Sequence, residues 1–380
     1  MGREIFHPWF VTALFHGGIL LLPLWKSRGE CLVAKRTGKN NKPTVRDVAK
    51  AAGVSLATVD RVLNQRKGVR QATIEKVEKA VADLNFTRDV GASLLARAKS
   101  ARIHFVLPAG TNPFMHSLES AVAQQAEIAA QARVDVDMSS VPPLNAEALV
   151  EEIDRLADDS CDCAVIVATD DDALRRAVAR ALTKGLPTIT LVSDLPQSKR
   201  RAFVGIDNEA AGRTAASLLG RFCPPNAQIG LIVGSLDLRD HRDRFIGFSE
   251  VMLEEFPGIE IIGPAEGFDD ARETAKRANE LLNDNPRLAG IYSIGAGNDG
   301  LMTTLRQRIS PGRVKVVVHE LTEASREGLA GGYIDAVLNQ NVAHEAERAI
   351  RFAQLLAVQP SAELDRTPVE IGIYLRDNVI

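Results

Sequence analysis

From residue 103 to residue 380, short apolar runs alternate with longer amphipathic segments. In residues 146–157 and 272–282, for example, apolar residues recur at helical spacing between the runs. Strands that are buried on both faces are apolar at most positions, so this alternation predicts an α/β fold whose parallel sheets carry helices on both faces. The nine predicted strands are IHFVLP, VDVDM, CAVIVAT, PTITLVS, AFVGI, QIGLIVG, IEIIG, LAGIYSI and VKVVV.

The length of 380 residues exceeds what one hydrophobic core can organise, so we expect more than one folded unit. Two parallel sheets that face each other across a cleft would form a binding site at the carboxyl ends of their strands. We divide the chain into an N-terminal extension (1–42), a small all-α domain (43–87), a linker (88–101) and a two-lobed α/β body (102–380).

The net charge of −3 is unevenly distributed along the chain. Residues 33–102 hold 16 lysines and arginines against 6 aspartates and glutamates, a charge of +10, whereas residues 103–380 carry −14. Clustered cations release counterions when they meet phosphates, so a basic head on an acidic body is typical of a protein that binds nucleic acid at one end. The alternative is a solvated basic tail.

The basic region has the pattern of three short helices. Thr44 with Asp47 resembles a capping arrangement at the start of the first helix. Gly53 ends that helix, Ser55 is placed to cap a second one, and residues 72–84 form a third amphipathic segment. This order predicts a helix-turn-helix domain, with a three-helix module that touches no DNA as the alternative.

The segment T-V-R-D-V-A-K-A-A-G-V-S-L-A-T-V-D-R-V-L-N, from Thr44 to Asn64, resembles the head of the LacI/GalR repressors. The resemblance implies that the second helix lies in the major groove, where Leu56, Ala57 and Arg61 contact bases. The same resemblance implies phosphate-contacting or helix-supporting roles for Ser55, Thr58 and Asn64, and Thr44 completes the predicted DNA-binding set.

Asp60 departs from the family pattern, because many relatives carry serine at this position. Its carboxylate could accept a hydrogen bond from cytosine N4, or could repel phosphate and orient Arg61. We favour the orienting role.

The linker R-D-V-G-A-S-L-L-A-R-A-K-S-A-R, which ends at Arg102, resembles the family's hinge helix. The resemblance implies that two copies fold together over a minor groove and that Leu95 wedges between base pairs, which kinks the site. The partners implied are therefore a pseudo-palindromic double-stranded DNA operator and a second copy of the chain, in a homodimer or a tetramer. A plain solvated linker is the alternative.

Polar and aromatic residues gather in the loops that follow the predicted strands, and no glycine-rich phosphate motif follows the first strand. Paired hydrogen-bonding groups suit hydroxyls, and an aromatic ring suits the C–H face of a sugar, so these loops predict a site for a small sugar or polyol. The predicted ligand-binding residues are Asn112, Phe114, Ser193, Asp194, Arg242, Phe268, Asn298, Glu320 and Gln340.

Residues 102–380 resemble both the sensor half of the LacI/GalR family and periplasmic sugar-binding proteins of the ribose-binding type. Within H-R-D-R-F-I-G-F the resemblance implies that Arg242 grips ligand hydroxyls, and within G-N-D-G that Asn298 contacts the ligand. Glu320 stands where many relatives have aspartate. The Ser193–Asp194 pair departs from the commoner Asp-Arg pair, which leaves the identity of the sugar open.

Other classes of function find little support in the sequence. Hydrolase, zinc-protease and nucleotide-loop motifs are absent, and the four cysteines lack metal-ligand spacing, so we expect neither an enzyme nor a cofactor or metal. We expect a cytoplasmic protein that is not membrane-bound. The apolar run at residues 9–25 suggests one alternative, an exported sugar receptor of a transporter. This alternative loses its support if translation begins after the run, for example at Val33.

The sequence therefore predicts a ligand-controlled transcriptional regulator, most simply a repressor. A ligand acts through its difference in affinity for two states, so the sequence leaves open whether it releases the protein from DNA or recruits it.

Overall fold

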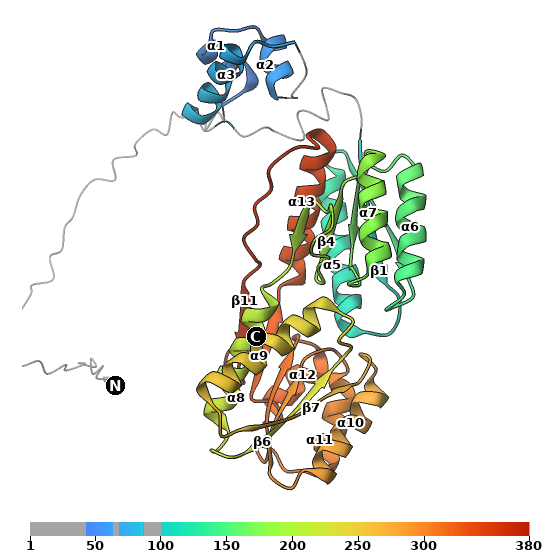
Figure 1. Ribbon diagram of the computed structural model, residues 1–380, viewed down its shortest axis with the longest axis vertical. Coiled ribbons are helices and arrows are strands. Elements are labelled where there is room, and N and C mark those ends of the chain that lie inside the picture. The colour runs from blue at the N-terminus through green and yellow to red at the C-terminus, as the bar shows by residue number, and fades with distance from the viewer. Residues whose placement is uncertain (1–42, 64–67, 85, 87–99, 380) are drawn as a thin grey trace, which may run out of the picture.

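The computed structural model describes residues 43–63, 68–84, 86 and 100–379, which form a small helical head and two α/β lobes (Figure 1). Asn64, Leu95 and the apolar run at 9–25 lie outside the described residues. Within the described ranges, no helix has the length and apolar character needed to cross a membrane.

The head consists of α1 (Val45–Ala52), α2 (Leu56–Leu63) and α3 (Gln71–Asp83). Its core is small and apolar, with Val48, Val59 and Val77 fully buried. Gly53 ends α1 in the left-handed conformation, at φ 65°, and the Val54 N–H bonds to the Ala49 carbonyl oxygen. The predicted order is confirmed: a first helix, a turn at glycine, and two further helices.

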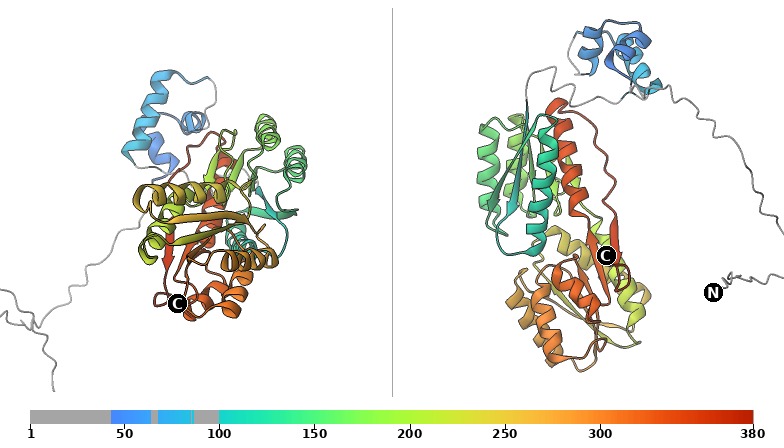
Figure 2. Two further views of the ribbon diagram at one scale, coloured as in Figure 1. Left: turned by 60° about the horizontal axis from the view of Figure 1, so that its bottom comes forward. Right: turned by 180° about the vertical axis from the view of Figure 1, so that it is seen from behind.

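The first lobe is a five-stranded parallel sheet in the order β2-β1-β3-β4-β5. Its strands are β1 (Ala101–Pro108), β2 (Val134–Val141), β3 (Cys163–Ile166), β4 (Thr188–Leu191) and β5 (Ala202–Val204). One face packs on α5 (Pro113–Ala130) and α13 (Val342–Val358), the other on α6 (Ala146–Asp158) and α7 (Asp172–Thr183) (Figure 2). Successive side chains of a strand point to opposite faces, so Phe105 lies in the first core and Val106 in the second.

The second lobe is a six-stranded sheet in the order β11-β10-β9-β8-β6-β7. Its strands are β6 (Gln228–Val233), β7 (Glu260–Glu266), β8 (Leu288–Ser293), β9 (Lys315–His319), β10 (Ala336–Gln340) and β11 (Ile371–Tyr374). Helices cover both faces, α8 (Asn208–Phe222) and α9 (Arg239–Glu255) on one, α10 (Ala271–Asp284), α11 (Asn298–Arg308) and α12 (Glu323–Ala330) on the other.

All nine predicted strands are present, but β10 and β11 were not predicted. The apolar part of β10 is only Ala336–Leu338, too short to stand out from a loop. The edge strand β11 runs antiparallel to β10, which corrects the expectation of entirely parallel sheets. It holds Gly372 and leaves Ile373 partly exposed, so it lacks the pattern of a buried strand.

The chain crosses between the lobes three times, after β5, after β10 and after α13. The third crossing, residues 359–370, is called the strap here; it runs along the outside of the molecule to β11 (Figure 1). Because α13 belongs to the first lobe while β10 and β11 belong to the second, neither lobe is a continuous piece of sequence.

Helices α8 and α9 approach each other closely because, where they touch, each helix has a glycine that packs directly against the backbone of the other. A Cβ on Gly212 would lie 2.0 Å from the carbonyl oxygen of Arg244, and a Cβ on Gly247 would lie 2.1 Å from that of Glu209. The two helices could not keep this spacing with any larger residue at either position.

We therefore expect Gly212→Ala to lower the free energy of unfolding by about 1–3 kcal/mol, because the added methyl group forces the helices apart. Urea denaturation followed by circular dichroism measures this. The matched control is Arg213→Ala, which removes only an exposed ion pair with Glu250 and should change stability by less than about 1 kcal/mol. Equal stability of the Gly212→Ala variant and the native protein would contradict this packing.

Candidate functional sites

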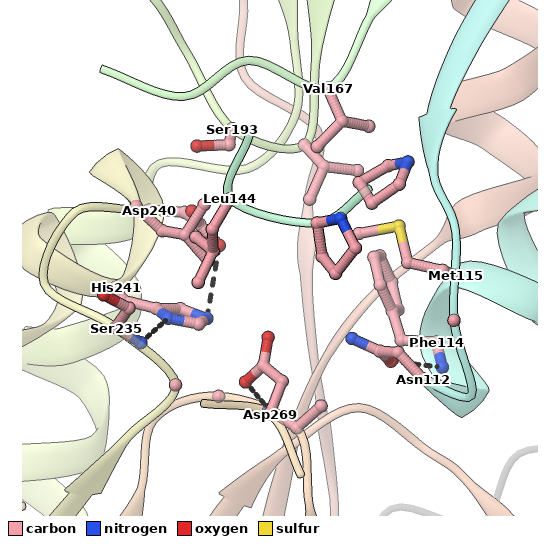
Figure 3. Close-up of a pocket in the computed structure, with 18 of the residues that line it drawn as sticks. Asn112, Phe114, Met115, Leu144, Val167, Ser193, Ser235, Asp240, His241 and Asp269 are labelled. Atoms are coloured by element: carbon pink, nitrogen blue, oxygen red, sulfur yellow. Dashed lines mark hydrogen bonds and ion pairs between the residues drawn. The ribbon is translucent and has the colours of Figure 1, made fainter. Parts of the chain in front are cut away.

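A cavity of about 390 Å³ lies between the two lobes, at the carboxyl ends of their strands (Figure 3). The first lobe contributes the loops after β1, β2, β3 and β4. The second lobe contributes the loops after β6, β7, β8 and β9, the start of α9, and Gln340 at the end of β10. Such a volume suits a small molecule.

Several buried polar atoms in the cavity wall have no hydrogen-bond partner in the protein. They come from both lobes and are Thr169 Oγ1, Ser193 Oγ, Asp240 Oδ1, Arg244 Nη2 and Gln340 Oε1. Buried polar groups in native proteins are nearly always paired, so a convergent set of unpaired ones in one cavity indicates a site for a ligand with many hydrogen-bonding groups.

Arg244 is the cation of the cavity and is only 2% exposed. Its Nε donates to Asn208 Oδ1 at 2.8 Å, and its Nη1 donates to the Ile294 carbonyl oxygen at 2.9 Å. The remaining nitrogen, Nη2, lies 4.0 Å from Glu320 Oε1. Two hydrogen bonds thus fix the guanidinium plane and leave one nitrogen to meet a ligand.

Glu320 follows β9 and has a positive φ of 67°. Its Oε1 accepts a hydrogen bond of 2.8 Å from Gln340 Nε2. Burial raises the pKa of Glu320 to about 7, and this effect outweighs the nearby Arg244 charge and the Gln340 hydrogen bond, which both lower it.

Backbone strain is concentrated around this cavity. Five non-glycine residues that line it adopt positive φ, namely Leu144, Val192, Phe268, Asp269 and Glu320. Residues in this region of φ cost energy and persist where the surrounding structure holds them, as at binding sites.

The histidine of the cavity has a defined tautomer. The Ser235 backbone N–H donates to His241 Nδ1 at 3.2 Å, so the ring hydrogen of the neutral form is on Nε2, which lies 3.6 Å from Asp240 Oδ2 (Figure 3). Asp269 Oδ1 accepts a 2.8 Å hydrogen bond from the Ala296 N–H, which fixes a further carboxylate in the wall.

The first lobe supplies most of the apolar wall. Phe114 and Met115 lie together at the start of α5, where Asn112 Oδ1 caps the helix by accepting from the Phe114 N–H at 3.0 Å. Phe268 of the second lobe is 53% exposed, a large value for an aromatic side chain. These rings can stack on the C–H face of a ligand.

Six of the nine predicted ligand residues line the cavity: Asn112, Phe114, Ser193, Phe268, Glu320 and Gln340. The other three, Asp194, Arg242 and Asn298, do not line it. Asp194 instead forms an ion pair with Arg200. Asn298 is buried below the cavity, where it accepts from Ser293 Oγ at 3.0 Å and donates to the His319 carbonyl oxygen at 2.8 Å.

The structure places Arg242 outside the cavity, contrary to its predicted contact with the ligand, and helix geometry gives the reason. Two positions along a helix are about 200° apart, so Arg242 and Arg244 point to different sides of α9. Arg242 forms an ion pair with Asp170 of the first lobe, and Arg175 binds the same carboxylate. Arg242 therefore connects the lobes, and the cavity arginine is Arg244.

The sequence analysis missed Asp240, His241, Arg244 and Asp269 as cavity residues. The first three could have been grouped from the sequence, because Arg244 follows Asp240 by four residues and His241 by three, and positions at these separations share one face of a helix. No local pattern marks Asp269, whose position depends on the strained turn after β7.

The DNA-facing surface predicted for the head lies on α2. Ser55, Leu56, Ala57 and Arg61 are exposed there, and Leu56 is 47% exposed, whereas Val59 is buried. An apolar side chain left in solvent on so small a domain suits contact with a thymine methyl group. Of the remaining predicted residues, Thr58 and Asp60 are half-buried.

Two of the predicted DNA-binding residues also hold the helix starts. The Thr58 N–H donates to Ser55 Oγ at 3.1 Å, which caps α2, and the Thr44 N–H donates to Asp47 Oδ2 at 2.7 Å at the start of α1. Both caps were predicted and are confirmed.

Within the residues that the structure describes, no group of three or more histidine, cysteine, aspartate or glutamate side chains is arranged to hold a metal ion.

Comparison with known proteins identifies both parts of the chain. The lacI family of bacterial regulatory proteins matches residues 44–89, and the periplasmic binding protein domain matches residues 103–359. The chain has a lacI-family head, and its body belongs to the periplasmic binding protein domain family. The family resemblance expected from the head and the body is thus confirmed, as is the two-part fold class.

Curated relatives of the chain include operon repressors. The ribose operon repressor of Halalkalibacterium halodurans is 29% identical over 251 residues, which cover 66% of this chain and 71% of the repressor. The lactose operon repressor of Escherichia coli (strain K12) is 30% identical over 242 residues, 63% of this chain and 64% of the repressor. The chain thus matches less than two thirds of the length of several relatives, among them a Streptomyces limosus regulator, at 62%.

Solved structures share the fold of the two-lobed body. An ABC transporter solute binding protein from Burkholderia graminis, in complex with D-arabinose, superposes with a TM-score of 0.68 at 20% identity, covering 74% of this chain and 97% of that one. The glucose-galactose binding protein GanP of Geobacillus stearothermophilus gives 0.66 at 18% identity, covering 74% and 99%.

The raised pKa of Glu320 predicts a pH dependence of folding. The folded protein holds the Glu320 proton up to about pH 7, whereas the unfolded chain releases it near the ordinary value, so this contribution is complete at low pH and is lost as pH rises through about 7. The loss should be on the order of 3 kcal/mol.

Urea denaturation at pH 5 and pH 8 measures it, with Glu320→Gln as the matched control, since its side chain keeps the shape of the neutral acid. The native protein should lose more stability between these pH values than the variant. If both lose the same amount, Glu320 does not retain its proton in the folded state.

Proposed function

We propose that this protein is a DNA-binding transcriptional regulator, acting as a repressor, whose operator affinity is controlled by an uncharged sugar or polyol in the interlobe cavity. The observation that carries the proposal is the set of unpaired buried polar atoms around one cavity, in a chain whose head exposes the face of α2. The names of relatives, repressors of ribose and lactose operons, support it.

The charges of the cavity favour an uncharged ligand. Four acidic residues, Asp240, Asp269, Asp270 and Glu320, line it, against one guanidinium on Arg244. Hydroxyl groups can donate to the carboxylates and accept from the guanidinium, whereas a phosphate or a carboxylate on the ligand would face repulsion. Phe114 and Phe268 offer surfaces for the ring of a sugar.

The proposed coupling uses the relative motion of the lobes. A ligand that contacts residues of both lobes, such as Ser193 and Arg244, favours the state in which they are closer. The Asp170–Arg242 ion pair also joins the lobes and would break if the cavity opened widely. In a homodimer this motion would change the spacing of the two heads on a pseudo-palindromic operator.

The proposal places the protein in the cytoplasm with its DNA and assigns it no enzymatic turnover. The basic head favours this function over that of a transport receptor. A gel-shift assay with the chain's own upstream region, with and without candidate sugars, tests the proposal. It fails if the purified protein binds that region no better than a scrambled duplex.

Arg61→Ala should weaken binding to the operator by about 1–3 kcal/mol and relax sequence preference, because the exposed Arg61 side chain is the base-reading cation on α2. Fluorescence anisotropy with operator and scrambled duplexes at one salt concentration measures both effects. The control is Lys79→Ala on α3, which removes an exposed cation outside α2 and should leave the preference between the two duplexes unchanged. Unchanged discrimination in the Arg61 variant would count against this role.

Arg244→Ala should abolish the response to the sugar while leaving DNA binding without sugar intact, because it removes the only guanidinium among the residues that line the cavity. A thermal-shift screen of pentoses, hexoses, polyols and inositols finds the ligand, and calorimetry then gives its affinity. We expect a loss of at least 100-fold, about 2.7 kcal/mol.

Arg242→Ala is the matched control, since Arg242 lies two residues away and outside the cavity; it should lose less than 10-fold. The phosphate ester and the uronic acid of the same sugar should not displace the sugar from the interlobe cavity of the native protein. A reversed order of the two arginine variants would refute the assignment of Arg244.

A further inference from the structure

A second hollow, of about 530 Å³, lies on the first lobe and shares no lining residue with the interlobe cavity. Two segments distant in sequence form most of its wall: residues 198–201, which lead into β5, and residues 361–366 of the strap. Leu182, near the end of α7, completes it.

The hollow is basic, although the body as a whole is acidic. Its lining holds Lys199, Arg200, Arg201 and Arg366 against one carboxylate, that of Glu363. Lys199, Arg200 and Arg201 come from one wall and Arg366 from the other, so cations stand on both sides of the hollow.

Most of these cations lack a carboxylate partner. Arg200 pairs with Asp194, but among the described residues no carboxylate lies within ion-pair distance of Lys199, Arg201 or Arg366. Elsewhere in the same lobe cations are neutralised locally, as in the pairs Arg180–Asp154 and Lys184–Asp158. Several unneutralised cations in one concave site favour binding of an anion.

The donor set suits a phosphate group. Arg201 uses one guanidinium nitrogen to donate to the Ala362 carbonyl oxygen at 2.9 Å and keeps other donors for a ligand. Guanidinium groups bind phosphate oxygens through paired hydrogen bonds, and an ammonium group adds a point charge. Ser361 supplies an exposed hydroxyl, while Leu182 and Leu364 offer apolar surface for a carbon skeleton.

The site also has a position from which it could influence the cavity. The strap leads directly to β11, and Ile371 at the start of β11 pairs with Gln340, whose side chain lines the interlobe cavity. A ligand that bridges Lys199 and Arg366 would hold the strap against the first lobe.

We propose that this hollow is a second effector site, which binds a small phosphate ester and clamps the strap to the first lobe. Its charge preference is opposite to that of the interlobe cavity. The two sites would thus respond to different classes of metabolite, one uncharged and one phosphorylated.

Calorimetry on the full chain at constant ionic strength tests the proposal, with inorganic phosphate and then a hexose phosphate as probes and chloride as the reference. We expect saturable binding of both probes and at least a 10-fold loss of affinity in Lys199→Ala/Arg366→Ala. Both side chains are exposed, so the double variant should fold, which its thermal midpoint in phosphate-free buffer checks.

The matched control is Arg313→Ala, an exposed cation of the second lobe, which should bind both probes as the native protein does. Heat that does not saturate, or equal affinity in the double variant, would overturn the proposal. So would a third result, in which only duplex DNA distinguishes the double variant from the native protein, because the hollow would then serve the nucleic-acid backbone.

Discussion

The buried guanidinium of Arg244 is the interaction on which the wall of the interlobe cavity most depends. A buried charge is tolerated only when hydrogen bonds and nearby polar groups compensate for lost water, and three segments provide them here. Asn208 starts α8 immediately after the first crossing between the lobes, Ile294 follows β8, and Glu320 follows β9. The side chain therefore ties together the ends of elements that are remote in sequence, and its backbone carbonyl meets Gly212 at the closest approach of α8 and α9.

The main features of the fold could be predicted from the sequence because they depend on local patterns. The head is specified by caps and a glycine turn within a few residues, and the central strands by continuous apolar runs. The elements that escaped prediction, β10 and β11, form where pairing with a neighbouring strand compensates for a weak pattern. Such pairing is set by tertiary structure, and no short window of sequence records it.

The candidate site was predicted less completely, and the errors have a common cause. The prediction of cavity residues was correct where the residue lies one or two positions after the end of its strand, as for Ser193 and Glu320. On α9 the choice between Arg242 and Arg244 depended on which side of the helix faces the cavity, and that orientation is fixed by Gly212 and Gly247. For Asn298 the residue type suited a ligand contact equally well, but two internal hydrogen bonds already use its amide group.

The discontinuity of the two lobes has a consequence for how the protein is made. The head depends only on contacts between neighbours in sequence, so it can fold as soon as it leaves the ribosome. The first lobe must wait, because one face of its sheet is covered only by α5 until α13 has been synthesised. A premature stop codon ahead of α13 would thus release a folded head attached to an incomplete body. Under the proposed function, such a product could bind an operator but could not respond to the sugar.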